Sequence, residues 1–221
     1  MAVPCFDNGG RMKFIGSYKR TLLLFSLLFA ATSHAATPNP CHTMAQSVPE
    51  NRVLPLLETS DGSDTVYGKS IIAYAAIMGE LDKVKAWVSE DNWRELEPDI
   101  LIDAAAAGQT EIVKTLLNMG VDPDWREEGG PTALIAVAGC ERLEMLTLLL
   151  DAGADPNARN ADGIDALMVG IGFGDVEVVR TLLDAGFDLS QSRLANGLGP
   201  FDLVRGGENK EILSVLEDYT N

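Results

Sequence analysis

The chain has few basic residues, histidines, cysteines and aromatic side chains. Lysine and arginine number 17 against 33 acidic residues, which gives a net charge of −16 over 221 residues. Binding to nucleic acid or to an anionic lipid surface requires clustered lysine and arginine, so this balance opposes both kinds of partner. Hydrophobic residues make up 46% of the chain, which is a globular rather than a disordered composition.

Two histidines and three cysteines leave few ligands for a transition metal and few general bases that act near neutral pH. Cys41 and His42 are neighbours, but they lie in a proline-rich segment that does not preorganise a catalytic site. The three glycines of residues 170–174 resemble a phosphate-binding loop in number only, because no strand precedes them. We expect no enzyme activity, no cofactor and no metal, and an enzyme that uses Cys41 and His42 is a distant alternative.

The apolar run at residues 22–31 is too short to span a bilayer, which takes about 20 apolar residues. Between Met12 and this run lie three basic residues, Lys13, Lys19 and Arg20. Small residues follow the run, an order typical of a secretory signal peptide that is cleaved, here between Ala35 and Ala36. We therefore predict a periplasmic protein, and an uncleaved N-terminal anchor is the alternative.

The predicted signal peptide occupies residues 1–35, and its true start is interpreted as Met12. Its removal takes away four basic residues and one acidic residue, so the mature chain carries a net charge of −19. The exported protein is thus more acidic than the whole chain.

The strongest pattern is an internal repeat with a period of 33 residues. Three similar segments begin with glutamate and end with glycine: 111–120, 144–153 and 177–186. Their apolar residues recur at helical spacing, and the closing glycine suits a left-handed helix end. Runs of small apolar residues predict a first helix in each unit: 104–107, 133–138 and 166–171. The recurring glutamates, at 111, 144, 177 and 211, indicate a structural role at a helix N-terminus.

The unit in the middle of the array resembles the ankyrin repeat. Residues 130–134 read Gly-Pro-Thr-Ala-Leu, and residues 149–159 read Leu-Leu-Asp-Ala-Gly-Ala-Asp-Pro-Asn-Ala-Arg. The resemblance implies an all-α fold, a solenoid of four to five helix-turn-helix units with β-turn fingers. The expected units are residues 67–92, 93–126, 127–159, 160–192 and 193–221.

Residues 36–66 contain four prolines and a polar stretch, and we predict an N-terminal arm or cap. An apolar patch at 53–57 indicates a short cap helix near 53–58 that covers the first repeat, and a flexible tether is the alternative. The first two repeats are closely spaced, so the loop at 92–98 is expected to lack a full finger.

Ankyrin-like units usually contact their partners through the finger tips and the two exposed residues that end the first helix. The resemblance therefore implies a binding surface that includes Met78, Trp125, Arg126, Glu127, Glu128, Cys140, Arg159, Asp162, Phe173 and Arg193. Met78, Trp125 and Phe173 are expected to be the apolar anchors of a charged groove. The alternative is that Trp125 tucks under its own finger and Phe173 packs on the adjacent unit.

Cys41 and Cys140 are the two cysteines of the mature chain. An oxidising compartment permits one disulfide between them. Because the family leaves the region of Cys140 open to partners, such a bond would fold the arm across the concave face. Two separate thiols are the alternative, and the sequence does not decide between them.

The resemblance implies a non-catalytic protein that binds another protein, and we expect a monomer. An inhibitor or immunity protein that neutralises an envelope-targeted bacterial toxin is the first hypothesis, because acidity and export suit a groove that plugs a basic active-site rim. A periplasmic stress-protection or assembly scaffold is the alternative. The expected partner is a protein with a basic contact surface, with no nucleic acid and no membrane contact after signal cleavage.

Overall fold

The structure is a computed structural model, and it describes residues 5–6, 12–13, 50–62, 64–66, 69–89, 99–205 and 209–220. The chain divides into two compact units, Met1–Thr37 and Pro38–Asn221. In the first unit, β1 (Cys5–Phe6) pairs antiparallel with β2 (Met12–Lys13). The apolar run of the predicted signal peptide, its cleavage site, the pair Cys41 and His42, and the loop at 92–98 lie outside the described residues.

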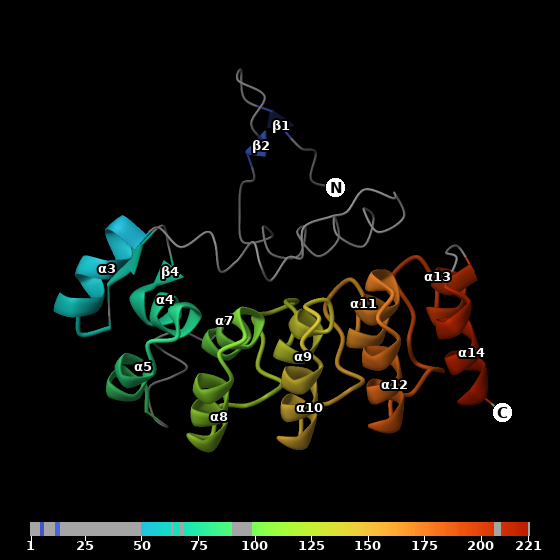
Figure 1. Cartoon of the computed structure of the whole chain (residues 1–221). Helices are drawn as coiled ribbons and strands as arrows, with labels where there is room; N and C mark the ends of the chain where they lie inside the picture. The colour runs from blue at the N-terminus through green and yellow to red at the C-terminus, as the bar shows by residue number, and fades with distance from the viewer. Residues whose placement is uncertain are drawn as a thin grey trace. The chain divides into compact units, whose positions relative to one another are not determined.

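The second unit is a row of helix pairs, each with a first and a second helix (Figure 1). The first helices are α4 (Ile71–Met78), α7 (Ile100–Ala107), α9 (Ala133–Val137), α11 (Ala166–Phe173) and α13 (Pro200–Arg205), and each packs on the next. The second helices are α5 (Leu81–Trp87), α8 (Thr110–Asn118), α10 (Leu143–Asp151), α12 (Val176–Asp184) and α14 (Lys210–Asp218). This arrangement is the expected all-α repeat solenoid.

The first helices differ in length from the sequence expectation. The helix predicted from residue 104 begins at Ile100, because the apolar residues that precede the alanines are also buried. Helix α11 extends two residues beyond the predicted end. Helix α9 stops at Val137, one residue earlier than predicted, and it has five residues where α7 and α11 have eight.

The expected cap helix is present as α3 (Glu50–Thr59), which packs on α4. Its buried residues Val53 and Leu57 come from the apolar patch. A short hairpin follows, formed by β3 (Thr65–Val66) and β4 (Lys69–Ser70), and it leads directly into α4. This hairpin is the finger of the first unit.

A polar side chain caps the first helix in three of the units. The Ala73 N–H donates to Ser70 Oγ at 3.1 Å, and the Ile135 N–H donates to Thr132 Oγ1 at 3.3 Å. The Met168 N–H donates to Asp165 Oδ1 at 2.8 Å. Serine, threonine and aspartate are all good N-caps, so the residue type changes between units while the cap is kept.

The second helices end as the repeat predicts. Gly120, Gly153 and Gly186 have φ values of 82°, 93° and 91°, the left-handed conformation that glycine adopts most easily. The same conformation ends α7 at Gly108, but after α9 it falls on Glu141, with a φ of 54°. A side chain is disfavoured there, so the α9–α10 turn departs from the rest of the array.

The recurring glutamates lie in the first turns of α8, α10, α12 and α14, as the sequence indicates. The core between the two layers consists of buried leucine, isoleucine, valine and alanine. In the part of the chain that the structure describes, no helix combines the length and the apolar character that a membrane crossing requires.

Candidate functional site

The fingers between repeats are tied to one another by a ladder of side-chain to main-chain hydrogen bonds. The Asp155 N–H donates to both carboxylate oxygens of Asp124 at 3.0 Å, and the Asp188 N–H donates to Asn157 Oδ1 at 2.7 Å. Asp124 and Asn157 occupy the same position in successive units, 33 residues apart. Burial raises the pKa of Asp124, although the hydrogen bond from the Asp155 N–H opposes that shift. The ladder holds the fingers in a fixed row.

A second set of contacts joins the fingers at residues 159–165 and 191–193. Arg159 Nη1 donates to the Gln191 carbonyl at 2.6 Å. The Ser192 hydroxyl donates to Asp165 Oδ2 at 2.5 Å, and both of these side chains are buried. Burial raises the pKa of Asp165, although its hydrogen bonds oppose that shift. Arg159 therefore holds two fingers together, in addition to any contact that it makes with a partner.

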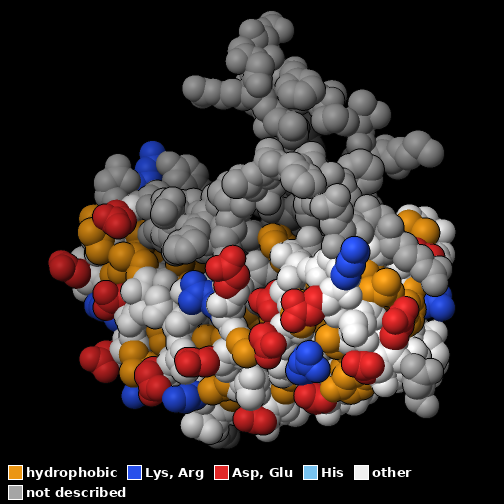
Figure 2. All heavy atoms as spheres, turned by 45° about the vertical axis from the view of Figure 1, so that its right-hand side comes forward, with side chains coloured by type: hydrophobic (Ala, Val, Ile, Leu, Met, Phe, Trp, Pro, Cys, Tyr) orange, Lys and Arg blue, Asp and Glu red, His pale blue; other side chains and the backbone are white. Residues whose placement is uncertain are grey.

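Most of the charged residues expected on the fingers are accessible. Arg126, Glu127, Glu128 and Arg193 are exposed, and Asp162 is half-buried. Arg193 Nη1 also donates to the Ser192 carbonyl at 2.6 Å. Figure 2 shows acidic side chains spread over one face of the molecule, with fewer lysines and arginines between them. Asp122, Asp155 and Asp188 are also exposed, so the fingers present an accessible surface with more acidic than basic side chains.

The three expected apolar anchors are less accessible than the finger charges. Met78, Trp125 and Phe173 are all half-buried. The ring of Phe173 lies against Gly139, since a Cβ atom added at that glycine would fall 2.7 Å from Phe173 Cε2. Phe173 therefore makes the inter-repeat contact that was the alternative to a free anchor.

Substitution of Gly139 by alanine is expected to destabilise the fold by about 1–2 kcal/mol, because the new methyl group overlaps the Phe173 ring. Thermal or urea unfolding measures the change. The double variant G139A/F173L removes the overlap and should recover part of the loss. Equal stability of G139A and the unmodified chain would contradict the contact.

Cys140 is only 4% exposed, so it offers little surface to a partner. It is disulfide-bonded, and the other half of the bond is outside the side chains that the structure describes. The pairing of Cys140 with Cys41 stays a prediction.

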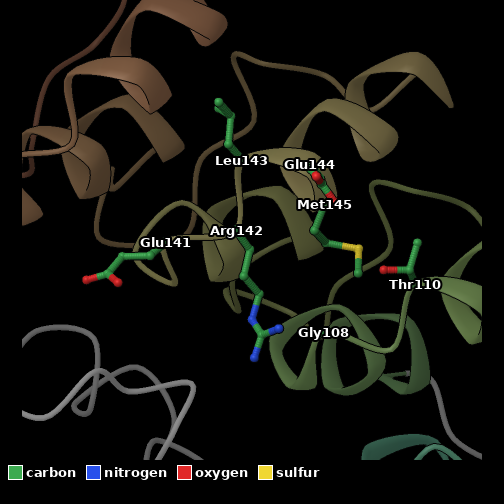
Figure 3. A pocket seen from close by; sticks show the side chains of 7 residues that line it. All are labelled: Gly108, Thr110, Glu141, Arg142, Leu143, Glu144 and Met145. Atoms are coloured by element: carbon green, nitrogen blue, oxygen red, sulfur yellow. The ribbon is translucent and has the colours of Figure 1, made fainter.

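The sequence interpretation missed a cavity of about 460 Å³ at the start of α8 and α10, shown in Figure 3. The residues that line it are Gly108, Thr110, Glu141, Arg142, Leu143, Glu144 and Met145. Arg142 points toward Gly108, and its guanidinium would overlap any side chain at that position. A second cavity of about 400 Å³ shares Leu143 and Glu144 and continues along α10 to Asp151.

The sequence did contain a signal for this region. Comparison of α10 with α8 and α12 at the 33-residue period shows Thr147 and Leu148 where the other helices have a basic residue and a threonine. Such a difference between otherwise similar units marks a surface that one unit does not share with its neighbours.

Among the described residues, no group of three or more histidine, cysteine, aspartate or glutamate side chains is placed to hold a metal ion. The resolved finger carboxylates and arginines bond to main-chain groups or face solvent. This chemistry suits recognition of another surface.

The family comparison identifies the repeat independently. Residues 101–193 match the family model for ankyrin repeats in three copies, which covers α7 to the finger before α13. No curated protein matches the chain at a significant level. Ankyrin repeats are in general non-catalytic modules for protein–protein interaction, and the helix pairs on either side of the matched segment extend the same array. The chain contains an array of ankyrin repeats.

Proposed function

We propose that this protein binds and neutralises another protein, and that the partner is a toxin directed at the bacterial envelope. The observation that carries the proposal is the fixed row of fingers. Because Asp124 and Asn157 hold successive fingers together, little conformational entropy is lost when a partner docks on them. A preorganised surface of this kind suits an inhibitor.

The charge of the row supports a partner with a basic contact surface. Glu127 and Glu128 project from one finger, and Asp162 lies on the next. Acidic fingers attract a basic surface over a distance and raise the association rate. A toxin with a basic active-site rim has such a contact surface. Fast association would let the protein capture the toxin rapidly when both are in the same compartment.

Export supports the same proposal. The basic residues, short apolar run and small residues of positions 13–36 follow the order of a cleaved signal peptide. A protein exported in this way meets toxins that act in the periplasm. A periplasmic stress-protection or assembly scaffold shares these features, so the number of partners separates the two roles.

The test is capture of partners from a periplasmic extract with the purified protein. One effector at one-to-one stoichiometry is expected for an inhibitor, whereas several housekeeping proteins would support the scaffold. Turnover of a substrate with no captured protein would overturn both roles.

Glu127→Lys is expected to weaken capture about tenfold, because it places a like charge against the basic partner. Glu58→Lys is the matched control, since Glu58 is also exposed but lies on α3, away from the fingers. Association rates from surface plasmon resonance measure both variants. If the two substitutions had equal effects, the weaker capture would result from the change in net charge and not from a contact made by the finger.

A further inference from the structure

The outer face of α10 differs from the same face of three other second helices, α5, α8 and α12, whereas α14 has Ser214 at the position of Thr147. In α5, α8 and α12, an acidic residue of the first turn is followed three residues later by a basic one: Asp82 and Lys85, Glu111 and Lys114, Glu177 and Arg180. In α8 the pair is formed, with Lys114 Nζ 2.9 Å from Glu111 Oε1. In α10 the corresponding residues are Glu144 and Thr147, so this glutamate has no basic residue at that position.

The same face of α10 is also more apolar. Leu148 is half-buried where α8 has Thr115 and α12 has Thr181. Leu143, at the start of the helix, is 37% exposed. The Thr147 hydroxyl donates to the Leu143 carbonyl at 2.9 Å, so its polar group is already satisfied within the helix. Leucine side chains in these positions gain free energy when a partner covers them.

The two cavities join along this face to form a groove. They share Leu143 and Glu144, and their lining residues run from Gly108 to Asp151. Figure 3 shows the residues of the first cavity. Leu143, Met145 and Leu148 supply its apolar lining, beside Thr110 and Thr147. Its charged residues are three carboxylates, from Glu141, Glu144 and Asp151, against the single guanidinium of Arg142. We infer that this α10 groove binds a basic amphipathic helix of a partner protein.

Charge and geometry define the occupant. Glu144 and Asp151 lie seven residues apart on α10, which places them about 10 Å apart along the helix axis. Two lysines or arginines seven residues apart on a docked helix reach both carboxylates, and leucines between them cover Leu143 and Leu148. A strand does not fit, because the face consists of helix side chains and has no strand edge whose main-chain groups could pair with it.

This surface is separate from the fingers, so its test does not depend on the partner of the proposed function. The probe is a synthetic peptide of about 18 residues, long enough to form a helix, with leucines at helical spacing and lysines seven residues apart. A second peptide has glutamate in place of each lysine. Fluorescence anisotropy measures binding of both peptides to the full protein. We expect binding of the lysine peptide, weaker binding at high salt, and no binding of the glutamate peptide.

The double variant Thr147→Lys/Leu148→Thr gives α10 a basic residue and a threonine at the positions where α8 and α12 have them, so the fold should be kept. It is expected to weaken peptide binding by about tenfold or more. Glu127→Lys, on a finger, should leave peptide binding unchanged.

Absence of binding of the lysine peptide, or equal binding to the Thr147→Lys/Leu148→Thr variant, would overturn the inference. If that variant loses its helical circular dichroism, Glu144→Gln serves instead, with a weaker expected loss of about threefold. A peptide that binds the unmodified protein and Glu144→Gln equally well would also overturn it.

Discussion

Replacement of Lys69 by methionine is expected to destabilise the protein by about 3 kcal/mol. Lys69 lies in β4 and pairs with Asp103 in α7, and the two side chains are 19% and 1% exposed. The substitution keeps most of the aliphatic volume but removes the cation beside a buried carboxylate. Leaving a buried charge without its counter-ion lowers the free energy of unfolding by more than the intact ion pair contributes to it.

The control for this prediction comes from the repeat itself. At the position of Asp103, the equivalent residue of α11 is Val169. The double variant K69M/D103V therefore replaces the ion pair by residues that suit an apolar site, and its stability should lie within about 1 kcal/mol of the unmodified protein. Urea unfolding measures the free energy of unfolding of both variants and of the unmodified protein. If K69M is as stable as the double variant, the ion pair does not hold the first finger to the second repeat.

Replacement of Asp165 by alanine is expected to cost about 2–3 kcal/mol. Asp165 caps α11 through the Met168 N–H and accepts the hydrogen bond of the buried Ser192 hydroxyl. Alanine leaves both donors without their acceptor in a site that water does not reach. Asp165→Asn keeps one oxygen for the cap, so it should be the milder change in unfolding experiments.

The same aspartate is expected to make the stability of the folded protein depend on pH. Burial raises the pKa of Asp165 in the folded state above the ordinary value of 3.8. Below that value the residue is protonated in both states, and its ionisation does not affect stability. As the pH rises above 3.8, the unfolded state loses its proton first, so ionisation lowers the relative stability of the folded protein until the folded-state pKa is passed.

The Asp165→Asn variant does not ionise, so its stability relative to the unmodified protein should increase as the pH rises from about 3.5 toward neutrality. Urea unfolding at several pH values measures this difference. A difference that stays constant, or that falls with pH, would mean that burial does not dominate the environment of this carboxyl group.

Features that recur in the sequence could be predicted, because each unit forms the same pair of helices and packs in the same way on its neighbours. The helix pairs, the glycine ends at Gly120, Gly153 and Gly186, and the first-turn glutamates are set by local backbone and helix preferences that act within one unit. The family match to residues 101–193 confirms the repeat that these signals predicted.

The binding surface was predicted less completely, because it depends on contacts between units. The pattern placed Phe173 and Arg159 at positions where ankyrin-like units meet partners. The structure shows that Phe173 rests on Gly139 and that Arg159 reaches Gln191. Each contact joins residues more than 30 positions apart, so no local pattern reports it.

The 33-residue period by itself determined that this protein is a repeat array, and the acidic charge led only to the expectation that polyanions are not its partners. Only the tertiary structure decided which charges face solvent, that Lys69 pairs with the buried Asp103, and that the α10 groove is open. The physical reason is that periodicity records what the units share. Function at a surface arises from the residues in which one unit differs from its neighbours, and their effect depends on what the fold places beside them.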